Sequence, residues 1–180
     1  MKMVAIVGMA GSGKSEVARA FEHHGFRKVR FGDITDEELG RRGFEMNEEN
    51  ERRVRQQLRE ERGMAAYAEL NLPRIDSALQ SSNVVVDGLY SWEEYAMLKG
   101  YYGRQLTTVA VHSSPATRYR RLARRAIRPL TKKEAAGRDK SELENLNKGG
   151  PIAMADFTIV NEASLAHLEE ETERVLLALK

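Results

Sequence analysis

The sequence has no cysteine, a single tryptophan and only four prolines among its 180 residues. Without cysteine, neither a disulfide framework nor a cysteine-ligated metal site can form. A long hydrophobic run is also missing, because the apolar stretch at residues 3–7 is too short for a membrane span or a signal-peptide core. We therefore expect a cytoplasmic protein with no membrane partner.

The sequence also lacks a strong excess of charge of either sign. Charged residues make up 31% of the chain, yet the formal net charge is only +2. A general nucleic-acid-binding protein would carry a larger basic excess, which argues against nucleic acid as a partner. Hydrophobic residues reach 41%, and a chain of this length can bury one core, so we predict a single domain at 1–180.

Short apolar runs alternate with helical patterns along the chain. The run Met3 to Val7 shows no polar alternation, which favours a strand buried on both faces of a parallel sheet. Four further runs are read as strands: Lys28 to Phe31, Val84 to Val86, Leu106 to Val111 and Phe157 to Val160. Strands that alternate with helices predict an α/β fold, here three αβα layers around a five-stranded parallel sheet.

Two polar stretches interrupt this pattern. Residues 35–80 are rich in helix formers, and Pro73 is expected to break a helix or to begin one. Residues 115–150 hold a basic helix of about 115–127, stopped by Pro129, and then a polar segment with several glycines. We predict a helical insert at 35–80, an Arg-rich lid at 115–150, and a core made of 1–34, 81–114 and 151–180.

The first apolar run is followed by a glycine-rich loop that fits the pattern G-x-x-x-x-G-K-[ST] in full. Glycine lets the backbone approach phosphate oxygens closely, and the amides at the start of the next helix form an anion site. The lysine adds a positive charge for the β- and γ-phosphates, and the serine hydroxyl is placed to ligate Mg²⁺. The predicted nucleotide-binding residues of this loop are Gly8, Ala10, Gly11, Ser12, Gly13, Lys14 and Ser15.

Two aspartates follow the predicted second and third strands. Asp87 comes after Val86, where a P-loop enzyme holds the Mg²⁺ shell, although an Asp-Gly turn is common at such a place. Asp33 would lie in the same crevice, because ligands of parallel sheets bind beyond the carboxyl ends of the strands. It could accept the proton of a substrate hydroxyl, or it could cap the helix that begins near Thr35.

The order of these motifs resembles the P-loop nucleoside monophosphate kinase superfamily, and within it dephospho-CoA kinase and adenylate-kinase-related proteins. The pieces that carry the resemblance in the C-terminal part are Arg121-Leu122, Arg125, Thr131, Glu134, Arg138-Asp139, Glu142, Ala155-Asp156 and Asn161 to Leu165. The resemblance implies that Arg125, Arg128 and Arg138 lie over the phosphates of ATP and neutralise transition-state charge. It also implies that Asn161 lies against the adenine and that Asp33 faces the acceptor.

The chain departs from these relatives where they bind the acceptor phosphate. Adenylate kinases carry an arginine three residues after the Gly-Asp pair, where this chain has Asp36, and the relatives carry another soon after the strand-end Asp-Gly, where it has Leu89-Tyr90-Ser91. Arg41, Arg42, Arg59 or Arg74 could substitute for them. The departures count against ordinary AMP phosphorylation.

These features favour an ATP- and Mg²⁺-dependent kinase for a small nucleotide-like acceptor, either dephospho-CoA or a nucleoside monophosphate. The alternative is a P-loop NTPase or nucleotide-binding protein without such an acceptor, with the Arg-rich segment as a nucleic-acid contact or a solvated face. A GTP switch is disfavoured, since the only Asn-Lys pair, Asn147-Lys148, is followed by two glycines. The acceptor, the choice of ATP over GTP and the oligomeric state stay open.

Overall fold

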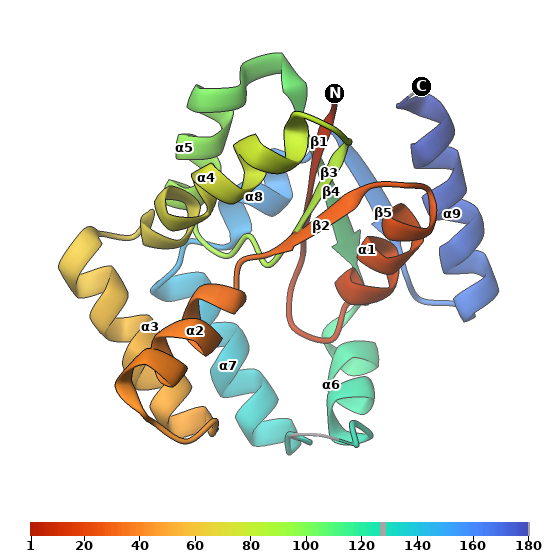
Figure 1. Cartoon of the computed structure of the whole chain (residues 1–180). Helices are drawn as coiled ribbons and strands as arrows, with labels where there is room; N and C mark the ends of the chain where they lie inside the picture. The colour runs from red at the N-terminus through yellow and green to blue at the C-terminus, as the bar shows by residue number, and fades with distance from the viewer. Residues whose placement is uncertain (127–128, 180) are drawn as a thin grey trace.

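In the computed structural model, which describes residues 1–126 and 129–179, a parallel sheet runs through the centre of the molecule (Figure 1). Its five strands lie in the order β2-β3-β1-β4-β5 and all pair in parallel. The strands are β1 (Met3–Val7), β2 (Arg27–Arg30), β3 (Val84–Asp87), β4 (Leu106–His112) and β5 (Phe157–Val160). The predicted α/β fold and its five-stranded parallel sheet are therefore confirmed.

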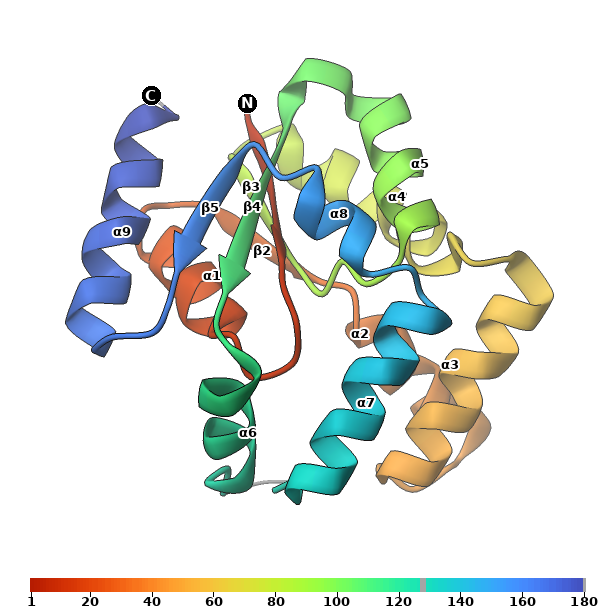
Figure 2. The ribbon, with the colours of Figure 1, turned by 180° about the vertical axis from the view of Figure 1, so that it is seen from behind.

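Helices cover both faces of this sheet, as the two opposite views show (Figures 1 and 2). The helices are α1 (Lys14–His23), α2 (Asp33–Arg42), α3 (Glu48–Arg62), α4 (Ala66–Leu79), α5 (Trp92–Tyr102), α6 (Pro115–Ala123), α7 (Lys132–Glu144), α8 (Gly149–Ala153) and α9 (Leu165–Ala178), with the 3-10 turn η1 (Gly103–Gln105). Helices α1 and α9 lie on one face, and α4, α5 and α8 lie on the other.

The central position of β1 explains why its residues do not alternate between apolar and polar. Val4 and Ile6 belong to the apolar core under α1 and α9, whereas Met3, Ala5 and Val7 belong to the core on the opposite face. All five side chains are fully buried. A central strand covered on both sides can therefore be apolar at every position.

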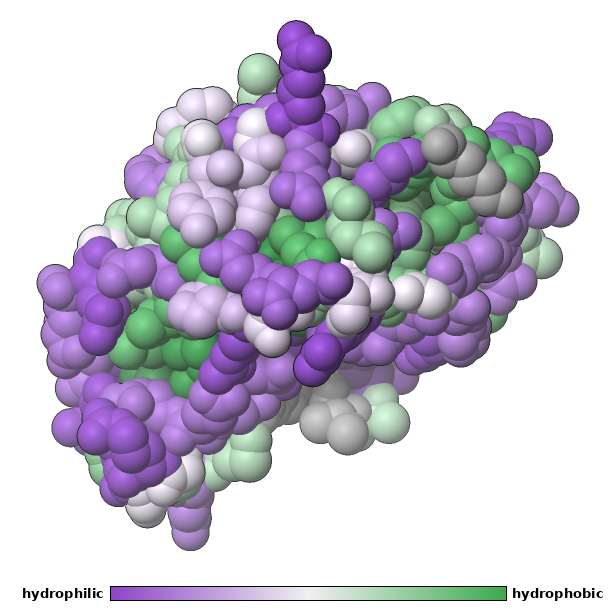
Figure 3. Space-filling view, turned by 45° about the horizontal axis from the view of Figure 1, so that its top comes forward, coloured by the Kyte–Doolittle hydropathy of each residue, from purple (hydrophilic) through white to green (hydrophobic). Residues whose placement is uncertain are grey.

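The carboxyl ends of the strands point toward the part of the molecule that holds α2, α3, α6 and α7 (Figure 2). A small apolar cluster of Ala10, Leu122 and Ala135 joins the loop after β1 to α6 and α7 there. The face seen in Figure 3 is hydrophilic over most of its area, with apolar residues in separate places. None of the helices in the described ranges has the length and apolar character needed to cross a membrane.

Two local predictions are wrong. Pro73 lies inside α4 rather than at its start or at a break. Its ring faces solvent, where water can satisfy the carbonyl of Glu69 that a helical amide would have bonded. The basic helix ends at Ala123 and not near residue 127, because the Leu122 carbonyl accepts hydrogen bonds from the amides of Arg125 and Leu130.

The polar segment after Pro129 is largely helical, although no helix was predicted there from the sequence. Thr131 and Glu134 form a capping box at the start of α7, with the Thr131 hydroxyl accepting from the Glu134 amide at 3.3 Å. The spacing of these two residues is a recognised helix-start signal. The same signal, formed by Ser91 and Glu94, marks the start of α5.

Candidate active site

The glycine-rich loop joins β1 to α1 at the carboxyl edge of the sheet. Gly11 and Gly13 have φ angles of 81° and 104°, in the left-handed region that favours glycine. Gly13 is the N-cap of α1, so the free amides of the first helical turn point away from the helix beyond it. Free amides at the positive end of a helix dipole make an anion-binding site.

The loop is also pressed tightly against the rest of the core. A Cβ atom at Gly13 would lie 2.3 Å from the Asn161 side-chain nitrogen, and one at Gly8 would lie 2.4 Å from the Val111 carbonyl oxygen. Neither distance is sterically allowed, so both positions require glycine. Two of the motif glycines are therefore fixed by close approach of the chain to itself, in addition to any ligand.

A cavity of about 240 Å³ opens beside this loop. Its lining brings together six of the residues singled out from the sequence, namely Ala10, Lys14, Ser15, Asp87, Arg125 and Arg138. It also includes six that were not singled out as site residues, namely Arg30, Gly32, Gly88, Tyr90, Glu142 and Lys148. These come from the ends of β2 and β3 and from the α7–α8 region, which only the tertiary fold brings to the loop.

Burial has the largest effect on the pKa of Lys14. Its ammonium donates to the Met9 carbonyl at 3.0 Å and lies among other charged groups of the cavity. Burial, followed by repulsion from Lys148, lowers the pKa of Lys14 to about 7. A polyphosphate brought next to this group would add negative charge and favour the ammonium form.

Asp87 ends β3 and faces the cavity from the side of the sheet. Burial raises the pKa of its carboxyl group, and the neighbouring Lys14 opposes that shift. A divalent cation would act in the same direction as Lys14 by stabilising the carboxylate. Ser15 lines the same cavity, so the hydroxyl and the carboxylate predicted for Mg²⁺ share one space.

The donor set fits Mg²⁺ bound together with a polyphosphate. Mg²⁺ is usually held by one or two protein oxygens, with water and phosphate oxygens completing an octahedron. Ser15 and Asp87 would supply those oxygens. No group of three or more histidine, cysteine or carboxylate side chains that could hold a metal by itself occurs in the described parts of the chain.

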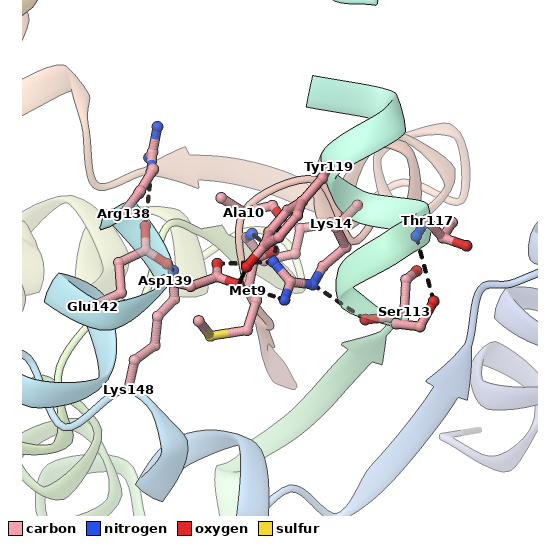
Figure 4. A network of polar contacts seen from close by, with 12 residues as sticks. Met9, Ala10, Lys14, Ser113, Thr117, Tyr119, Arg138, Asp139, Glu142 and Lys148 are labelled. Atoms are coloured by element: carbon pink, nitrogen blue, oxygen red, sulfur yellow. Dashed lines mark hydrogen bonds and ion pairs between the residues drawn. The ribbon is translucent and has the colours of Figure 1, made fainter. Parts of the chain in front are cut away.

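Helices α6 and α7 are tied to the glycine-rich loop by one buried arginine. Arg118, only 4% exposed, makes two hydrogen bonds of 2.8 and 2.6 Å to Asp139 and donates to the Ala10 carbonyl at 3.1 Å. Tyr119 donates to the same carboxylate at 2.9 Å, and Figure 4 shows its ring directed toward Asp139. This network positions the predicted lid relative to the phosphate loop.

Cationic side chains from this lid region reach the cavity. Arg138 and Lys148 both bond Glu142, at 3.0 and 2.7 Å, and Figure 4 shows Glu142 lying between them. Arg125 lines the cavity from the segment that follows α6 rather than from the helix itself. The prediction of a basic helix over about 115–127 is therefore wrong at Arg125, and Arg128 lies outside the described residues.

Two of the other predicted residues are engaged elsewhere. Asn161 is buried, donates to the Ser12 carbonyl at 2.8 Å and accepts from Arg121, so its side chain supports the back of the phosphate loop. Asp33 accepts from Arg30 at 2.8 Å at the wall of the cavity, whereas its own side chain is not part of the lining. Its alternative role as a helix cap is wrong, because Gly32 is the N-cap of α2 and no side chain caps it.

The four arginines considered as substitutes for the missing acceptor clamp do not line the cavity. Arg41 and Arg42 bond Glu38, Arg74 pairs with Glu37, and Arg59 lies 3.8 Å from Glu94. Arg30 does line it. The signal that could have found Arg30 is its place at the end of a strand, three residues before Asp33.

Comparison with known proteins identifies the family of this chain. A family model described as an AAA domain matches residues 4–147. A UPF0200 protein of Thermococcus kodakarensis is 38% identical over 178 residues, which span 97% of this chain and 96% of the relative. The chain belongs to the UPF0200 family. A second UPF0200 relative, from Hyperthermus butylicus, is 39% identical over 179 residues, spanning 98% of this chain and 94% of its own length.

Solved structures place this UPF0200 chain among the P-loop kinase folds. A shikimate kinase from Bacteroides thetaiotaomicron superposes with a TM-score of 0.62 at 17% identity, over 99% of this chain and 98% of that one. A gluconokinase from Sinorhizobium meliloti gives the same TM-score at 18% identity, over 99% of this chain and 93% of that one. At these identities the likeness shows the fold alone. The fold that the resemblance implied, a P-loop kinase-like α/β fold, is confirmed at that level.

Proposed function

We propose that this UPF0200 protein is an ATP- and Mg²⁺-dependent phosphotransferase that moves the γ-phosphoryl group of ATP to a small nucleotide-like acceptor. The observation that carries the proposal is the shared cavity, in which Lys14, Ser15 and Asp87 face the lid cations Arg125 and Arg138. Phosphoryl transfer requires little covalent help from a protein and depends on position and charge neutralisation. The cavity provides both.

The P-loop residues bind and orient the triphosphate in this proposal. The amides at the start of α1 and the Lys14 ammonium hold phosphate oxygens, and Ser15 with Asp87 would hold Mg²⁺. When bound there, the ion would neutralise phosphate charge. Lys14 remains protonated through the reaction and acts as a fixed positive charge.

The lid residues act on the opposite side of the cavity. Arg125 and Arg138 neutralise charge that develops on the transferred group, and the Arg118–Asp139 pair holds α7 over the loop. Lid residues that surround the nucleotide exclude water, which favours transfer to an acceptor over hydrolysis.

On the acceptor side, Asp33 is the proposed general base. An acceptor hydroxyl oxygen attacks the γ-phosphorus, the bond to the β,γ-bridging oxygen breaks, and its electron pair leaves on ADP. The hydroxyl proton passes to the Asp33 carboxylate. Arg30 orients that carboxylate through a 2.8 Å hydrogen bond and itself lines the cavity. Two structural neighbours are named as a gluconokinase and a shikimate kinase, which supports a small-molecule acceptor but not its nucleotide-like character.

A panel of acceptors tests the proposal. Labelled ATP and Mg²⁺ are incubated with dephospho-CoA, with each nucleoside monophosphate and with RNA, and the labelled products are separated. A phosphorylated small acceptor supports the kinase. Lys14→Ala should abolish its formation, and retention of full turnover by this variant would disprove the phosphate role.

A paired substitution tests the acceptor side. Asp33→Asn should lower transfer far more than it lowers ATP binding, because the proposed base is lost. Asp36→Asn is the matched control, since Asp36 also bonds Arg30, at 2.7 Å, but is not proposed to touch the acceptor. Equal losses in the two variants would count against Asp33 as the base.

The second candidate is an NTPase or nucleotide-binding protein without a small acceptor. Two observations favour it. Asp33 already accepts a hydrogen bond from Arg30, and the cavity lining does not include Arg41, Arg42, Arg59 or Arg74. ADP that appears at one rate with and without every acceptor in the panel would support this alternative.

A further inference from the structure

Lys148 is a buried lysine that the P-loop motif does not explain. Its side chain is 1% exposed, its ammonium bonds Glu142 at 2.7 Å, and it lies 4.6 Å from the centre of the Tyr90 ring. Lysine is rarely buried unless it is paired or has a functional role. Lys148 nevertheless lines the same cavity as Lys14.

The residue before Lys148 has an unusual backbone conformation. Asn147 has a φ of 49°, and among the described residues it is the one residue other than glycine with a positive φ. Non-glycine residues in such conformations cluster at functional sites, where the surrounding structure imposes them. Here the turn lies between α7 and α8, and the buried Lys148 ammonium follows directly from it.

The charges around the cavity are unbalanced. Among the described residues, five cationic side chains line it, namely Lys14, Arg30, Arg125, Arg138 and Lys148, but only two acidic ones, Asp87 and Glu142. Glu142 is shared between Lys148 and Arg138. A cavity with this excess of positive charge fits a polyanion.

The position of Lys148 separates it from the P-loop cations. The P-loop amides and Lys14 belong to the start of α1, whereas Lys148 lies with Glu142 and Arg138 on the α7–α8 side of the cavity (Figure 4). Its ammonium has three donors, and Glu142 is its one hydrogen-bond acceptor within the described part of the chain. Donors are therefore left for an anion in the cavity.

We infer that Lys148 is a second catalytic lysine, which contacts the transferred γ-phosphoryl group and not the β-phosphate. This inference rests on the proposed function, since it names a further contact in the same site. Lys148 acts as a fixed positive charge and transfers no proton. Glu142 holds it in place before the nucleotide binds.

The test compares binding of Mg·ADP with binding of a non-hydrolysable Mg·ATP analogue by calorimetry. Lys148→Gln should weaken the analogue about tenfold or more, because a charged hydrogen bond is lost, and should change ADP binding less than twofold. Lys140→Gln is the matched control, since it removes one positive charge from the exposed face of α7. It should change neither affinity.

The outcomes separate this inference from the proposed function. Equal loss of both ligands in Lys148→Gln, or loss of neither, overturns the γ-phosphoryl contact while the kinase proposal stands. If the wild-type protein binds neither ligand, both proposals fall.

A second pair of variants covers the case in which Lys148→Gln does not fold because Glu142 loses one of its two cationic partners and keeps only Arg138. Glu142→Gln alone is then compared with the double variant that carries both substitutions. The double variant should still lose affinity for the analogue relative to Glu142→Gln and keep its affinity for ADP. An unchanged ratio of the two affinities would overturn the inference.

Discussion

Gly13 meets two separate constraints, one from its backbone and one from its neighbour. Its φ of 104° disfavours any side chain, and a Cβ would collide with the Asn161 nitrogen. Gly25 provides a contrast, since its φ is 82° but no atom lies within 4 Å of its added Cβ. The pair therefore separates backbone strain from steric collision.

We predict that Gly25→Ala costs about 1 kcal/mol of unfolding free energy, from the left-handed backbone alone. Gly13→Ala should cost about 3 kcal/mol, because overpacking adds to the strain, and should abolish nucleotide binding. Denaturant unfolding and calorimetry measure the two effects. Equal destabilisation in both variants would show that the Asn161 contact yields without cost.

Lys14 should make nucleotide binding depend on protons. Its pKa of about 7 without a ligand means that much of it is neutral at pH 8, and the phosphate charge should restore the ammonium form. We predict that ATP binding takes up close to one proton at pH 8 and fewer at pH 6. Calorimetry in buffers with different ionisation enthalpies measures this uptake, which Lys14→Ala should remove.

The same shift affects stability in a defined direction. The folded pKa of Lys14, about 7, lies below its ordinary value of 10.5, so unfolding takes up a proton between these limits. The Lys14 contribution to the free energy of unfolding therefore rises with pH from about 7 to 10.5.

The sequence identified Lys14, Ser15 and Asp87 because each has a place in a local motif next to a strand. It did not identify Arg30, Tyr90, Glu142 and Lys148 as site residues. Each of these is separated along the chain from the phosphate loop, and no spacing rule connects them to it. Burial and proximity made them part of the site.

At the scale of elements, the buried Arg118–Asp139 pair decides how α6 and α7 meet the phosphate loop. The two side chains share two hydrogen bonds, and Arg118 also holds Ala10. Removing one partner of a buried pair leaves the other charge uncompensated. The Arg-rich segment was expected to contact phosphate, to contact nucleic acid or to be a solvated face, whereas Arg118 has a structural role.

We predict that Asp139→Asn destabilises the protein by about 3 kcal/mol and weakens nucleotide binding. Arg19→Gln, which breaks the exposed pair with Glu16 on α1, should leave the unfolding midpoint unchanged within error. Thermal unfolding of both variants provides the comparison. An Asp139→Asn protein with wild-type stability would contradict the proposed coupling of α7 to the loop.

Local signals predicted some element boundaries and not others. The Ser91–Glu94 capping box and the Asn47 cap mark the starts of α5 and α3, and such boundaries are readable from sequence because both signals involve contacts within one turn. The exact end of α6 was not predicted: the helix ends at Ala123, several residues before Pro129, and the Leu122 carbonyl accepts from the amides of Arg125 and Leu130.

At the scale of the whole molecule, the nucleotide should hold the sheet edge, the loop and the lid together. A ligand that binds only the folded state stabilises it by roughly 2.7 kcal/mol at a concentration of one hundred times its Kd. For a chain of this size, that corresponds to an increase of about 5–10 °C in Tm. We predict this increase for Mg·ATP and its loss in Lys14→Ala, as measured by scanning calorimetry.

The sequence by itself determined the sheet and the glycine-rich loop that follows its first strand. Continuous apolar runs specify strands buried on both faces, and the G-x-x-x-x-G-K-S loop carries its backbone geometry and its charge in adjacent residues. Only the tertiary structure decided which charges face that loop. Lys148 and Arg30 reach the cavity because parallel strands end at one edge and the α7–α8 turn returns over it, and such contacts depend on the packing of segments far apart in the chain.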